Sequence, residues 1–165
     1  MLMNCVLISL RLNAEGLKTG VSRRIKFNVD GSVRGKPGPA GIERVLRDSN
    51  GKVICLFSKF VSVTDSNTVE LWAIRKAVQL CITNPNLKDR DIAVISDSKV
   101  AVAWVNSEEV GNVAHMNTIY EIRNCMRSKC SIEVLYESRA FNSFADSLAK
   151  MGSSKNGDFV EWRDL

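Results

Sequence analysis

The chain carries an aspartate within a short predicted strand. Residues 25–30 alternate between apolar and polar types: Ile25, Phe27 and Val29 against Lys26, Asn28 and Asp30. This period of two predicts a strand with one buried face, and Gly31 and Ser32 end it. Aspartate is depleted from strands, so Asp30 is either a solvated or turn residue or it serves a function. The rest of the chain favours a function, because three further acids also stand at the edges of apolar elements.

Three strands are predicted in succession. After the first strand, the glycines and prolines of residues 33–39 break any regular element. Residues 40–48 and 52–61 are expected to form two further strands, and the Asn50-Gly51 pair between them is a strong hairpin signal. The three strands are therefore expected to be antiparallel.

Helices and strands alternate over the remainder of the chain. The predicted elements are a helix over 66–82, a strand over 91–96, helices over 99–106 and 117–129, a strand over 131–136 and a helix over 141–151. The nearly continuous apolar run within 91–96 is typical of a strand buried on both faces. The order of elements predicts an α/β domain with a mixed sheet.

The other three acids occupy special places in these elements. Glu70 heads an apolar helical stripe that continues at Ala73, Ile74, Ala77, Val78 and Cys81. Asp97 follows a buried strand, at the end where α/β folds build their sites, although a helix N-cap is the alternative. Asp146 shares one side of the final helix with Asn142, four residues earlier.

Composition fits one intracellular domain. With 165 residues, 45% of them hydrophobic, the chain is long enough for a substantial core, and we expect a domain over 23–152 between an N-terminal extension (1–22) and a polar tail (153–165). The tail is expected to be frayed, with Phe159 and Trp162 able to dock. The net charge of +5 permits a polyanionic partner.

The cysteines and the N-terminal segment bear on location. Five cysteines without C-x-x-C spacing argue against disulfides and zinc, so we expect reduced, mostly buried thiols in a reducing intracellular compartment, whether cytoplasm, nucleus or organelle. The apolar residues 1–12 are too few to span a bilayer, and no membrane partner is expected.

Four local motifs resemble those of the ribonuclease H family, in the family's order. They are residues 28–32 followed by 37–41, Ser66-Asn67 shortly before Glu70, Ser96-Asp97-Ser98, and residues 145–150. The similarity covers about residues 24–151 and is closest to ribonuclease H-like domains of plant genomes, which are related to the reverse-transcriptase-associated type. Four motifs in register form a specific signal, whereas each alone is weak.

The resemblance implies a five-stranded mixed sheet flanked by helices, with three antiparallel strands followed by parallel ones. It also implies a monomeric, metal-dependent endonuclease that cleaves the RNA strand of RNA/DNA hybrids. The implied metal ligands and catalytic residues are Asp30, Glu70, Asp97 and Asp146. Clustered carboxylates repel unless cations occupy the site, and Mg²⁺ prefers such oxygen ligands. The resemblance implies two Mg²⁺ ions, with Mn²⁺ as a possible substitute.

The resemblance also implies contacts to the hybrid. The implied residues are Gly31, Ser32, Asn67 and Asn142, with Asn67 in the minor groove, where the ribose 2′-hydroxyl can be read. Each has a simpler alternative: turn chemistry for the first two and helix capping for the asparagines.

One departure from the family pattern supports a second hypothesis. Tyr136, ten residues before Asp146, stands where the family commonly has a histidine that assists proton transfer. The alternative function is therefore a weak or inactive hybrid-binding domain derived from a retroelement. A related exonuclease or integrase acting on DNA is a third hypothesis, which the three-strand opening disfavours.

Overall fold

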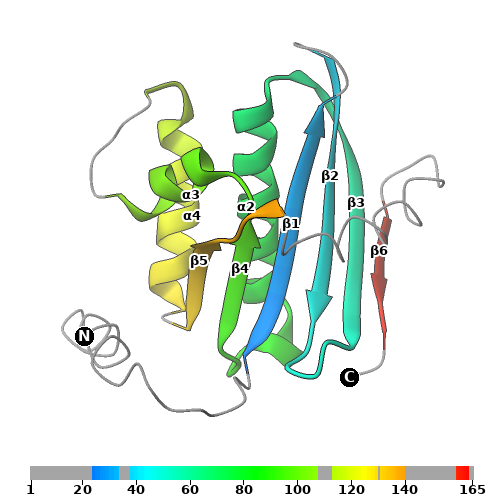
Figure 1. Cartoon of the computed structure of the whole chain (residues 1–165). Helices are drawn as coiled ribbons and strands as arrows, with labels where there is room; N and C mark the ends of the chain where they lie inside the picture. The colour runs from blue at the N-terminus through cyan, green and yellow to red at the C-terminus, as the bar shows by residue number, and fades with distance from the viewer. Residues whose placement is uncertain (1–23, 34–37, 108–112, 130, 140–158, 164–165) are drawn as a thin grey trace.

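The computed structural model describes residues 24–33, 38–107, 113–129, 131–139 and 159–163 (Figure 1). The extension predicted over residues 1–22 lies outside these ranges. So does the final helix predicted over 141–151, together with Asn142 and Asp146. The domain boundaries at 23 and 152 remain predictions.

A six-stranded mixed sheet organises the described residues, in the order β5-β4-β1-β2-β3-β6. The strands are β1 (Ile25–Val33), β2 (Gly38–Arg47), β3 (Val53–Thr64), β4 (Ile92–Ser96), β5 (Ile132–Tyr136) and β6 (Phe159–Trp162). The pairs β1/β2, β2/β3 and β3/β6 are antiparallel, whereas β1/β4 and β4/β5 are parallel. The predicted antiparallel opening and parallel second half are confirmed.

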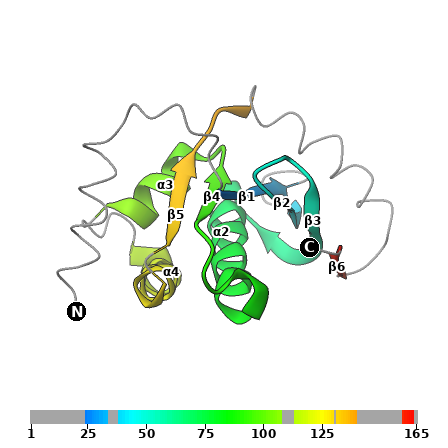
Figure 2. The same ribbon diagram turned by 90° about the horizontal axis from the view of Figure 1, so that it is seen from below.

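The helices cover one face of this sheet (Figure 2). They are α2 (Ser66–Thr83), α3 (Lys99–Asn106) and α4 (Met116–Ser128), with two short 3-10 turns, η1 (Pro85–Leu87) and η2 (Val113–His115). The apolar stripe of α2 packs on the buried face of β1, so that Phe27, Leu71 and Ile74 are inaccessible to solvent. None of the described helices is long and apolar enough to cross a membrane.

The hairpin between β2 and β3 forms at the predicted place. The Oδ1 atom of Asp48 accepts hydrogen bonds from the backbone N–H groups of Asn50 (2.8 Å) and Lys52 (2.9 Å). Gly51 has a φ of +84°, a conformation that a residue without Cβ adopts readily. The turn chemistry of this segment therefore fixes the pairing register of the two strands.

The expectation of five strands was wrong, because residues 159–162 add a sixth, and these residues are not frayed; the alternative that Phe159 and Trp162 dock is confirmed. These residues form β6 and pair with β3, with Cys55 opposite Trp162 and Ser58 opposite Phe159. Without β6, β3 would be an edge strand with a row of backbone N–H and C=O groups to satisfy, and pairing satisfies them. Cys55 and Cys81 are buried free thiols, as expected, while Cys5 and Cys130 lie outside the described ranges.

Candidate active site

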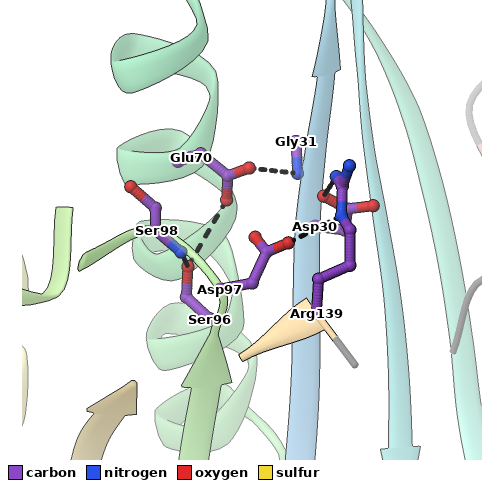
Figure 3. A network of polar contacts seen from close by, with 7 residues as sticks. All are labelled: Asp30, Gly31, Glu70, Ser96, Asp97, Ser98 and Arg139. Carbon is purple, nitrogen blue, oxygen red and sulfur yellow. Dashed lines mark hydrogen bonds and ion pairs between the residues drawn. The ribbon is translucent and has the colours of Figure 1, made fainter. Parts of the chain in front are cut away.

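Three of the four predicted acids meet at one end of the sheet (Figure 3). Asp30 lies on β1, Glu70 on α2, and Asp97 directly follows β4. In the parallel pair β1/β4, Val29 is opposite Ser96, so the next residues on the two strands, Asp30 and Asp97, are neighbours. One carboxylate oxygen from each acid lies within 4.8 Å of the others. The topology therefore brings together residues that are far apart in the sequence.

Glu70 is held by two hydrogen bonds from neighbouring strands. The backbone N–H of Gly31 donates to its Oε1 (3.2 Å), and the hydroxyl of Ser96 donates to its Oε2 (3.4 Å). The Oγ atom of Ser96 in turn accepts from the backbone N–H of Ser98 (3.1 Å). With only 7% of its surface exposed, Glu70 is fixed between β1 and β4.

The environment of Glu70 opposes its negative charge. Burial, followed by the charges of Asp30 and Asp97, raises the pKa of Glu70 from 4.5 to about 8, while the two hydrogen bonds act in the opposite direction. A cation between the three carboxylates would remove this repulsion. The donor set of hard carboxylate oxygens fits a divalent ion such as Mg²⁺.

An arginine that the sequence analysis did not single out completes the charge cluster. The Nε atom of Arg139, three residues after β5, donates to Asp97 Oδ2 (2.9 Å), and its Nη2 lies 3.7 Å from Asp30 Oδ1. Figure 3 shows this guanidinium beside both aspartates. The sequence analysis considered only the net charge of the chain and assigned no role to this residue. The sequence did offer one indication of a role for Arg139. It lies seven residues before Asp146 and just after the predicted strand 131–136, close in sequence to a predicted site residue.

Comparison with known proteins identifies the family of the chain. Residues 28–152 match the family model described as reverse transcriptase-like. The chain belongs to this family. No curated protein sequence matches it.

Solved structures share the fold of this reverse transcriptase-like chain. LC11-RNase H1, isolated from compost by a metagenomic approach, is 25% identical in sequence, with a TM-score of 0.68. The superposition covers 81% of this chain and 99% of the LC11-RNase H1 chain. RNase H1 of the archaeon Halobacterium salinarum is 22% identical with a TM-score of 0.67, covering 79% and 98%. The protease-reverse transcriptase of prototype foamy virus is 22% identical with a TM-score of 0.66, covering 84% of this chain and 22% of its own. The predicted ribonuclease H-like fold is confirmed.

LC11-RNase H1 has also been solved in complex with an RNA/DNA hybrid. That structure is 25% identical to the reverse transcriptase-like chain with a TM-score of 0.67, covering 77% of this chain and 94% of its own.

The structure tests the capping alternative at two of the predicted site residues, Asn67 and Asp97. The N-cap of α2 is Asp65, whose side chain accepts from the backbone N–H of Thr68 (3.0 Å), so the capping alternative for Asn67 was wrong. The N-cap of α3 is Ser98, which accepts from Ala101 N–H (3.2 Å), so the capping alternative for Asp97 was also wrong. Asp97 instead turns toward the other acids, and Asn67 is exposed on the first turn of α2.

Tyr136 ends β5 opposite Ser96 of β4. The residue is 42% exposed, and its ring lies beneath the ammonium group of Lys99, with the Nζ atom 5.1 Å from the ring centroid. In this reverse transcriptase-like chain, an aromatic ring with a cationic neighbour thus stands where the sequence comparison placed the histidine of related enzymes.

Gly31 is required because β1 and α2 approach each other closely. A Cβ atom at this position would lie 2.5 Å from Val69 Cγ1 and 2.9 Å from the backbone nitrogen of Glu70. We therefore expect Gly31→Ala to destabilise the domain by about 1–3 kcal/mol, because a rigid helix backbone must move. Urea unfolding followed by circular dichroism measures this change.

A double-mutant cycle tests whether the close approach is the cause. Val69→Ala removes one of the two clashing groups, so Gly31→Ala should be less destabilising in the Val69→Ala background than in the wild type. Equal stability of Gly31→Ala and the wild type would contradict the close packing of α2 on β1.

Proposed function

We propose that the chain is a metal-dependent endonuclease that hydrolyses the RNA strand of RNA/DNA hybrids, leaving a 5′-phosphate and a 3′-hydroxyl. The observation that carries the proposal is the convergence of Asp30, Glu70 and Asp97, with carboxylate oxygens within 4.8 Å of one another, on a ribonuclease H-like fold. Glu70 is buried and the other two acids are partly buried, so their mutual repulsion is poorly screened by water and would be relieved by a bound cation.

The metal part of the proposal rests on the donor set. Asp30, Glu70 and Asp97 would hold Mg²⁺ together with Asp146, and two ions are proposed, with Mn²⁺ as a substitute. Such ions lower the pKa of water and stabilise the charge that develops on the leaving oxygen. The residues of the chain supply the frame: Gly31 and Ser96 fix the two oxygens of Glu70 and thereby orient it toward Asp30 and Asp97.

The hybrid is the proposed substrate because the related LC11-RNase H1 binds one. We propose that Gly31, Ser32, Asn67 and Asn142 contact it. The exposed side chain of Asn67 stands one turn before Glu70 on α2, so it can reach a sugar edge while the acids face the scissile phosphate. Reading the ribose 2′-hydroxyl at this place would distinguish RNA from DNA.

A cleavage assay tests the proposed function. End-labelled RNA/DNA hybrid, double-stranded RNA and double-stranded DNA are incubated with the protein in Mg²⁺ or in chelator. We expect cleavage of the RNA strand of the hybrid alone, and only with Mg²⁺. Cleavage of duplex DNA at an equal rate would favour a DNA-directed relative instead.

A second candidate function is a hybrid-binding domain that turns over slowly or not at all. The position of Tyr136 favours it, because an imidazole changes charge near neutral pH and a phenol does not. The only histidine of the sequence, His115, lies in η2, and its ring packs against Trp104 at 5.2 Å between centroids. A gel-shift assay with uncleaved hybrid in Ca²⁺ separates binding from turnover.

Restoring the histidine should accelerate the reaction. We expect Tyr136→His to raise the single-turnover rate at least about tenfold at neutral pH, because positioned acid–base help is typically worth about 10²- to 10⁴-fold. The Mg²⁺ dependence should stay the same. Tyr120→His, at the exposed tyrosine of α4, is the matched control and should leave the rate unchanged.

One outcome would contradict the prediction for Tyr136→His. If a folded Tyr136→His protein is no faster than the wild type between pH 6 and 9, residue 136 is held away from the reacting groups, and its contact with Lys99 is structural.

A further inference from the structure

The guanidinium of Arg139 lies between the two aspartates that would share a metal ion. Its Nε donates to Asp97 at 2.9 Å, and its Nη2 is 3.7 Å from Asp30. These two nitrogens belong to one planar fork, a shape suited to bridging carboxylate oxygens. The positive charge therefore stands where the proposed metal site needs one.

Arg139 is placed to leave this position easily. Its side chain is 77% exposed, whereas the side chains of Asp30 and Asp97 are 29% and 12% exposed. An exposed ion pair is individually weak, because water solvates the released cation. Lys99, a second cation near this end of the sheet among the described residues, lies over the ring of Tyr136. Arg139 is thus a tethered cation beside a fixed acidic cluster.

We propose that Arg139 is an internal counter-cation of the acidic site, which a divalent metal ion must displace in order to bind. The inference rests on the proposed function, because it assumes that Asp30 and Asp97 hold the metal. It has two consequences. The guanidinium reduces carboxylate repulsion in the metal-free protein, and it weakens metal affinity by competing for the same oxygens.

Direct metal binding tests the inference without any catalytic readout. Isothermal titration with Mg²⁺, and Mn²⁺ titration followed by electron paramagnetic resonance, are done on the full chain at fixed ionic strength. We expect Arg139→Gln to bind roughly two- to fivefold more tightly than the wild type, which is the range expected for loss of a competing, exposed ion pair. Arg139→Lys retains the charge and should stay near the wild type.

A control separates this local competition from a general charge effect. Arg163→Gln removes one positive charge from the residue after β6, where Arg163 pairs with Glu161 at 3.3 Å. It should leave metal affinity unchanged. A gain equal to that of Arg139→Gln would show that net charge alone sets the affinity and would overturn the inference.

The remaining outcomes distinguish the inference from the function on which it rests. If Asp97→Asn loses Mn²⁺ binding but Arg139→Gln binds no more tightly than the wild type, the metal site stands and the counter-cation role is wrong. Weaker binding by Arg139→Gln would also overturn that role, because the arginine would then support the metal. If the wild-type chain binds neither ion, the proposed metal-dependent function and the inference both fail.

Discussion

Asp97→Asn should abolish hybrid cleavage while leaving the fold intact. The amide removes a negative charge and replaces one ligand oxygen with a donor, yet it preserves the shape of the side chain. Loss of one preorganised group in a site that stabilises developing charge costs about 10²- to 10³-fold in rate, and we expect at least this loss. Asp30→Asn should behave alike, because Asp30 stands beside Asp97 in the β1/β4 register. Single-turnover cleavage in Mg²⁺ is the measurement.

The same strand provides the matched control. Asp91 precedes β4, Asp97 follows it, and Asp91 is exposed. Asp91→Asn changes the net charge by the same amount at the opposite end of the strand, so its rate should equal that of the wild type. The fold should survive Asp97→Asn because Ser98, not Asp97, caps α3. A wild-type rate for folded Asp97→Asn would refute the assignment of the metal site.

Local patterns were sufficient to predict most of the fold. The alternation in β1, the Asn50-Gly51 turn and the apolar stripe of α2 are each set by neighbours a few residues away, and the structure has all three. The site could be anticipated at Asp97, because it follows the carboxyl end of a buried strand, where α/β folds build their sites. The site residues that could be predicted are therefore those that the order and direction of the strands and helices bring together.

Features that depend on distant partners were missed. β6 has four residues, and its pairing with β3 joins segments about a hundred positions apart, with Cys55 opposite Trp162. Likewise, Arg139 could not be assigned to the site from the sequence, because it reaches Asp97 and Asp30 only once β5 has paired with β4. A single charged residue in a polar segment is not part of a repeating sequence pattern, so the sequence does not indicate which residue it pairs with. The N-cap of α2 is Asp65 and not Asn67, for which capping was considered. Several adjacent residues are chemically able to cap the helix, so the sequence alone does not decide among them.

Glu70 should make the metal-free protein less stable as the pH rises. Burial and the neighbouring acids raise the pKa of Glu70 in the folded state to about 8, from 4.5 for an ordinary glutamate side chain. Between these values the folded state binds more protons than the unfolded state, so the free energy of unfolding falls with increasing pH, by at most about 1.4 kcal/mol per unit. From pH 5.5 to 8.5 we expect a loss of about 2–3 kcal/mol from this group. Urea unfolding in chelator measures it.

Replacing the titrating group should remove this pH dependence. Glu70→Gln keeps an acceptor for the Gly31 N–H but cannot ionise, so it should be more stable than the wild type at pH 8.5 and nearly equal at pH 5.5. Glu121→Gln, at an exposed glutamate of α4, should retain the wild-type slope. Saturating Mg²⁺ should also flatten the slope in the wild type, because bound cations favour the ionised carboxylate. If Glu70→Gln falls in stability as steeply as the wild type, Glu70 is already ionised in the metal-free fold, and the acids repel each other less than their 4.8 Å clustering implies.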